Sequence, residues 1–284
     1  MPCELPRDRA KGARVSPAMP FLPLGDETKH QRIDFAWATW SLIALSFFVF
    51  VYQQGLTRQE GLDLVYRLGS IPAVLFGRAS LGDALDTLPA AMTLFTYQFL
   101  HGNWDHLLGN LLFLWIFGDN VEDAMGHKRF LAFYLLCGVL AAVVYGAFAM
   151  DSTVPLIGAS GAISGVLGAY VLLHPFARII VLVVVLPLKL PAWILLLVWF
   201  GFQFVALGSD SVGGDDVAWA AHIAGFIAGA ALVPIFRTAG VPLFQRNAPP
   251  RVLGVRRPGR APRRAPSAGQ ERRRRDEPRR GPWG

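Results

Sequence analysis

Six apolar runs constrain the fold of this chain more than any other feature of its sequence. They cover residues 35–53, 104–118, 130–150, 160–174, 191–208 and 217–236. A helix needs about 17–25 apolar residues to cross a bilayer, and fewer where one end is buried in protein. Hydrophobic residues make up 53% of the 284 residues and charged residues only 17%. The sequence therefore predicts an all-α polytopic membrane protein with six spans.

The basic residues predict the orientation of these spans. Six spans place both termini on one side of the membrane, and 24 of the 27 Lys and Arg residues then fall on that side. Cytoplasmic segments carry such an excess, so we expect both termini in the cytoplasm. The run from Arg178 to Trp193 is short and interrupted by prolines. It fits an interfacial or re-entrant segment that leads into the fifth span.

Charge and proline content divide the chain into three parts. We expect a disordered cytoplasmic segment over residues 1–33, a six-span membrane domain over 34–237 and a disordered basic tail over 238–284. Nothing before Ile33 has the apolar core of a cleavable signal peptide, so the first span should stay in the mature protein. The tail should act as an orientation signal attracted to anionic lipid, and nucleic-acid binding is not expected.

The segment between the first two spans is long and mixes apolar residues, turn formers and scattered charges. This mixture predicts short amphipathic helices at the outer interface, with a solvated loop as the alternative. The two cysteines, Cys3 and Cys137, lie in very different settings and lack metal-ligand neighbours at useful spacing. We therefore expect no disulfide, no metal and no cofactor.

Three of the expected spans carry strongly polar side chains at one depth. His106, Ser160 and His222 each lie 13–15 residues before the expected cytoplasmic end of their span, which is about 20–22 Å along a helix. The three spans run in the same direction, so these residues share a layer roughly 10 Å below the outer surface. Asn110 lies one turn deeper than His106 on the same helix face. Polar residues at such depth are costly, which marks them as functional candidates.

A serine and a histidine on neighbouring helices are the minimum for nucleophilic acyl chemistry. A hydroxyl is a poor nucleophile until a base removes its proton, and His222 is placed to do this for Ser160. Ser160 stands at an expected helix start, where its backbone N–H lacks an intrahelical partner and can face a developing oxyanion. His106 and Asn110 bring side-chain donors to the same place.

Small residues allow these helices to approach closely. They are Gly158, Gly161, Gly165 and Gly168 around the fourth span and Gly225 and Gly229 in the sixth. Such faces are common in membrane helices, so packing alone would explain either Ser160 or Ser164 by itself. The shared layer of serine, histidines and asparagine favours chemistry instead.

These stretches resemble a known family. HGNWDHLLGN, GASG and AHIAGFIAG, in this order on separate spans, are similar to the rhomboid family of intramembrane serine proteases, over most of residues 90–236. The resemblance implies a bacterial-type bundle of six transmembrane helices with a long first external loop. It also implies Ser160 as the nucleophile and His222 as the general base, with His106 and Asn110 as oxyanion donors.

The resemblance extends to two further features and fails at two positions. His101 matches the first histidine of the family's HxxxxHxxxN pattern, which suggests a second-layer or loop-anchoring role, and residues 191–216 match its gate for substrate and water. Many members have a tyrosine four residues after the nucleophile, on which the imidazole stacks, whereas this chain has Ser164. Many also have Trp-Arg in the first external loop, where the nearest pair here is Tyr66-Arg67.

The sequence thus predicts a serine endopeptidase that hydrolyses peptide bonds in or near transmembrane segments of other proteins in the lipid bilayer. A catalytically silent relative that binds client helices and a small transporter are the alternatives. The presence of both Ser160 and His222 favours the enzyme, and the lack of acidic residues deep in a span disfavours the transporter. The expected location is a bacterial inner membrane, with both termini cytoplasmic and the oligomeric state open.

Overall fold

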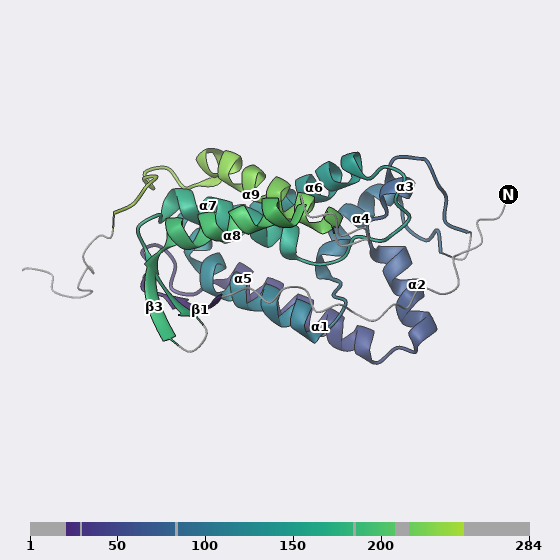
Figure 1. Ribbon diagram of the computed structural model, residues 1–284, viewed down its shortest axis with the longest axis horizontal. Helices are drawn as coiled ribbons and strands as arrows, with labels where there is room; N and C mark the ends of the chain where they lie inside the picture. The colour runs from purple at the N-terminus through teal and green to yellow at the C-terminus, as the bar shows by residue number, and fades with distance from the viewer. Residues whose placement is uncertain (1–20, 29, 83–84, 184–185, 208–215, 247–284) are drawn as a thin grey trace, which may run out of the picture. The chain divides into compact units, whose positions relative to one another are not determined.

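The computed structural model describes residues 21–28, 30–82, 85–183, 186–207 and 216–246. Long helices lie alongside one another, with short helices at one end and a small sheet at the other (Figure 1). In chain order the elements are β1 (Phe21–Asp26), α1 (Trp37–Gln54), α2 (Arg58–Leu68), α3 (Pro72–Leu75), α4 (Ala90–Thr96), the 3-10 turn η1 (Tyr97–Phe99), α5 (Trp104–Met125), α6 (His127–Phe148), α7 (Ser160–Leu173), β2 (Arg178–Val183), β3 (Leu186–Pro191), α8 (Ala192–Leu207) and α9 (Asp216–Phe236).

Six of these helices coincide with the six apolar runs. They are α1 and α5 to α9. Among the described residues, two helical stretches are long and apolar enough by themselves to cross a membrane, His127–Phe148 and Trp219–Phe236. The apolar helices Ser160–Leu173 and Ala192–Phe202 are shorter. The helical bundle agrees with the expected class, while the count of six spans stays a prediction.

Acidic residues near the end of α5 fix the start of α1. The side chain of Glu122 is fully buried, and its carboxylate accepts hydrogen bonds from the backbone N–H groups of Ala38 and Thr39 at 2.9 and 2.7 Å. It also accepts the Thr39 hydroxyl at 2.6 Å and lies 2.5 Å from Nδ1 of His127. The first N–H groups of a helix have no intrahelical partner, so this carboxylate satisfies them from another helix.

The neighbouring Asp123 holds the chain just before α1. One oxygen of its carboxylate accepts three successive backbone N–H groups, those of Gln31, Arg32 and Ile33, at 3.0, 2.7 and 2.9 Å. Because the two acidic side chains act on adjacent stretches, α5 determines where the chain turns into the first long helix.

A three-stranded antiparallel sheet corrects three expectations. β2 pairs with both β1 and β3, and Lys189 of β3 lies 2.5 Å from Glu27, whose pKa this contact holds below its ordinary value. The fold is mostly helical but not entirely so, residues 21–26 form a strand within the segment expected to be disordered, and the run from Arg178 forms a β-hairpin where an interfacial or re-entrant segment was expected. Its β-branched residues favour a strand, and β1 supplies the partner.

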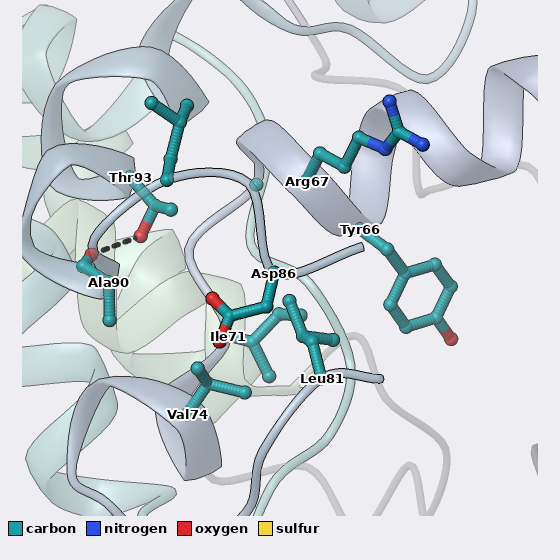
Figure 2. A pocket seen from close by; sticks show the side chains of 10 residues that line it. Tyr66, Arg67, Ile71, Val74, Leu81, Asp86, Ala90 and Thr93 are labelled. Carbon is teal, nitrogen blue, oxygen red and sulfur yellow. Dashed lines mark hydrogen bonds between the residues drawn. The ribbon is translucent and has the colours of Figure 1, made fainter. Parts of the chain in front are cut away.

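The segment between α1 and α5 contains short helices, as the sequence predicts. α2 begins with a capping box in which Thr57 and Glu60 exchange side-chain and backbone hydrogen bonds. A small pocket lies between α2, α3 and α4 (Figure 2). Its lining residues are Tyr66, Arg67, Gly69, Ile71, Val74, Leu81, Asp86, Leu88, Ala90 and Thr93. The Tyr66-Arg67 pair thus belongs to the packing of this loop.

Replacing Glu122 with Ala should destabilise the fold strongly, because the buried N–H groups of Ala38 and Thr39 would lose their acceptor. We expect the free energy of unfolding to fall by about 2–4 kcal/mol, measured as a lower thermal midpoint in detergent. The exposed capping-box variant Glu60→Ala is the matched control and should shift the midpoint far less. Equal shifts in the two variants would contradict the capping role of Glu122.

Candidate functional site

The centre of the site is the contact between α7 and α9, which pack backbone against backbone. A Cβ atom added at Gly225 would overlap the carbonyl oxygen of Gly161, and one added at Gly229 would overlap that of Gly165. Only glycine allows helix axes to come this close. The two glycine rows therefore fix the height of α7 against α9.

This packing places Ser160 beside the turn that carries His222. Ser160 is the first residue of α7. A Cβ at the next residue, Gly161, would lie 3.9 Å from the carbonyl oxygen of Ala221, which directly precedes His222. On its other side the same Cβ would lie 2.8 Å from the Cβ of Ala141 on α6. The start of α7 is thus enclosed between α6 and α9.

The loop before α7 brings α5 to the same place. Gly158 has a backbone φ of +119°, which residues other than glycine rarely adopt. Its N–H donates to the carbonyl oxygen of Tyr97 at 2.9 Å. A Cβ at Gly158 would lie 2.7 Å from Nε2 of His106 and 3.8 Å from Oγ of Ser160. The imidazole of His106 and the hydroxyl of Ser160 therefore flank one glycine.

Two side chains on α5, those of His106 and Asn110, are the expected hydrogen-bond donors of the site. The backbone N–H of His106 donates to the N-capping side chain of Asn103 at 2.8 Å, which fixes the start of α5. Asn110, one turn further on, is 8% exposed, and its Nδ2 has no hydrogen-bond partner among the described residues. A buried amide without an acceptor is costly and uncommon, which marks Asn110 as a donor held ready for one.

His101 lies behind His106. The residue is 2% exposed, and its ring centroid lies 5.2 Å from that of His106. Its backbone N–H donates to Oε1 of Gln53 at 3.1 Å, and Nε2 of Gln53 donates to its carbonyl oxygen at 3.3 Å. His101 therefore ties the end of α1 to the segment that enters α5.

Ser164 lies one turn below Ser160 and points back along its own helix. Its hydroxyl donates to the carbonyl oxygen of Ser160 at 2.7 Å, and the residue is 1% exposed. This intrahelical bond satisfies the Ser164 hydroxyl within α7.

Three aromatic residues contribute to the site without having been predicted. Tyr97 holds the Gly158 loop and donates its hydroxyl to the carbonyl oxygen of Gly138 at 2.7 Å. The ring centroid of Trp219 lies 5.6 Å from that of His222, and the centroid of Trp199 lies 6.3 Å from it. Trp219 stands three residues before His222, so its helical spacing was a usable signal, whereas nothing in the sequence pairs Trp199 with His222.

The similarity to known proteins covers the part of the chain that contains the site. A family model described as the Rhomboid domain matches residues 89–239, which is more than half of the chain. The chain belongs to the rhomboid family. Rhomboid membership makes it an integral membrane protein, and the matched range contains every helix that contributes to the site, α5 to α9.

Several curated rhomboid proteins are similar to this chain. Rhomboid protein 1, mitochondrial, of Saccharomyces cerevisiae is 29% identical over 59% of the chain and 51% of its own length. Rhomboid-like protein 11, chloroplastic, of Arabidopsis thaliana is 40% identical over 30% of each. Rhomboid protease GluP of Bacillus subtilis is 35% identical over 46% of the chain and 23% of its own length. The chain thus spans about half or less of each relative.

Adding a methyl group at Gly229 should separate α7 from α9, because the new Cβ has no room beside Gly165. We expect Gly229→Ala to lower the free energy of unfolding by about 1–3 kcal/mol, read from the thermal midpoint in detergent. Gly201→Ala on α8 is the control, since a Cβ there meets nothing within 4 Å. A midpoint for Gly229→Ala equal to that of the control would show that the close contact of the two helices is not required.

Proposed function

We propose that this rhomboid protein is an intramembrane serine endopeptidase in which Ser160 is the nucleophile and His222 the general base. The observation that carries the proposal is the glycine contact that sets the first turn of α7 beside the His222 turn of α9. A relative with 35% identity is a protease by name, Rhomboid protease GluP. The alternative is a catalytically silent rhomboid protein that binds client helices.

The reaction follows from these two side chains. His222 removes the proton from the Ser160 hydroxyl as Oγ attacks the carbonyl carbon of the scissile peptide bond. The resulting imidazolium gives this proton to the leaving amine, the C–N bond breaks and an acyl-enzyme remains. His222 then takes a proton from a water molecule that attacks the ester carbonyl. The imidazolium returns this proton to Oγ of Ser160 as the C–Oγ bond breaks, which releases the second product as a carboxylic acid.

The oxyanion has donors from two helices. The backbone N–H of Ser160 stands in the first turn of α7, where it has no intrahelical partner. His106 and Asn110 supply side-chain N–H groups from α5, and Gly158 leaves room between His106 and Ser160 because it has no side chain. Preorganised donors of this kind stabilise the tetrahedral stage more than the ground state.

The substrates follow from the depth of the site. A peptide bond in a transmembrane helix must leave its helical hydrogen bonds before a nucleophile can reach it. We infer that substrates are membrane proteins with Gly, Pro or other weak helix formers near the outer leaflet. The proposed setting is a bacterial inner membrane with both termini in the cytoplasm and α8 as the gate.

A fluorophosphonate probe tests the choice of serine. Ser160→Ala and His222→Ala should abolish labelling, because the first removes the nucleophile and the second removes its base. Ser164→Ala should keep substantial labelling, since that hydroxyl only donates to the carbonyl oxygen of Ser160. All variants are compared in one detergent after their thermal midpoints are checked. Labelling that survives Ser160→Ala but is lost in Ser164→Ala would identify the other serine as the nucleophile.

A further inference from the structure

We propose that Trp199 and Trp219 are positioning residues that hold the imidazole of His222, in the role that a tyrosine after the nucleophile has in many rhomboid proteins. This inference rests on the proposed function of His222 as the general base. This chain lacks that tyrosine, because Ser164 occupies its position and donates its hydroxyl within its own helix. Ser164 presents no ring on which the imidazole can stack.

Trp219 approaches the imidazole from the same helix. It precedes His222 by three residues on α9, so both side chains lie on one face. Their ring centroids are 5.6 Å apart and their planes meet at 85°, which is an edge-to-face pair. Such pairs have a preferred geometry and so restrict rotation of the smaller ring.

Trp199 approaches from α8, on the next helix. It is 6% exposed, and its ring centroid lies 6.3 Å from His222 and 6.3 Å from Phe226, with interplanar angles of 34° to both rings. Phe226 in turn stacks on Phe200 of α8 with centroids 4.4 Å apart. The imidazole is therefore bounded by an aromatic row that joins α8 to α9, helices that lie side by side in Figure 1.

Trp199 lies on α8, and this links the position of His222 to that helix. α8 is the helix that corresponds to the family's gate, so the ring that restricts His222 is carried by the element expected to move. The packing of α8 against α9 keeps Trp199 beside the imidazole of His222. Displacement of α8 would leave Trp219 as the remaining aromatic neighbour from this pair.

The two tryptophans can be tested by the rate and the affinity of fluorophosphonate labelling measured separately. Trp199→Ala and Trp219→Ala should each lower the limiting labelling rate constant by about three- to tenfold, with little change in the probe concentration for half-maximal rate. Trp199→Phe and Trp219→Phe should restore most of the rate, because phenylalanine keeps an aromatic face. Trp193→Ala is the matched control on α8, since Trp193 is 42% exposed.

The outcome distinguishes this inference from the proposed function. Loss of labelling in Ser160→Ala and His222→Ala but not in the tryptophan variants would overturn the inference and leave the function standing. Absence of labelling in the unmodified protein would count against the function. In that case the NMR chemical shifts of the His222 ring protons, in protein isotopically labelled at histidine, test whether the two tryptophans contact the imidazole. They should change in both phenylalanine variants and not in Trp193→Ala, and unchanged shifts would overturn it.

Discussion

The contact between the backbones of α7 and α9 is the constraint on which the rest of the site depends. Because Gly225 and Gly229 of α9 lie against the carbonyl groups of Gly161 and Gly165, the two helices can neither slide nor separate without breaking many close contacts. This contact places the start of α7 beside the turn of α9 that carries His222. The proposed chemistry between Ser160 and His222 therefore depends on glycines, which have no side chain to keep the two helices apart.

The opposite end of the bundle is held by polar contacts of a different kind. Buried carboxylates at the end of α5 accept the N–H groups around the start of α1, and β1 adds a strand to the hairpin that leads into α8. Since β3 ends at Pro191 and α8 begins at Ala192, the sheet fixes one end of the helix that carries Trp199. The sheet and the proposed gate helix α8 are therefore joined without an intervening loop.

The helices, and the closeness of the start of α7 to His106 and to the turn of His222, were predictable from the sequence for one physical reason. Apolar runs, glycine spacing and polar residues at one depth are local features, and helices translate local spacing directly into position. β1 escaped prediction because FLPLGD has little strand character and acquires a partner about 155 residues later. Trp199 escaped for the same reason, since its proximity to His222 depends on how α8 packs against α9. The depth of Asn110 in its span identified it as a candidate from the sequence. That its side-chain Nδ2 has no hydrogen-bond partner among the described residues could be seen only in the structure.

Cleavage of a single-span substrate is the most direct test of intramembrane proteolysis by this chain. The purified chain would be reconstituted in liposomes with a test protein that has glycine residues near the outer end of its transmembrane segment, and the products would be mapped by mass spectrometry. The account predicts one main cut in or beside that segment with the unmodified chain, and none with His222→Ala in the same liposomes. No cut with the unmodified chain, or equal cutting by both, would contradict it.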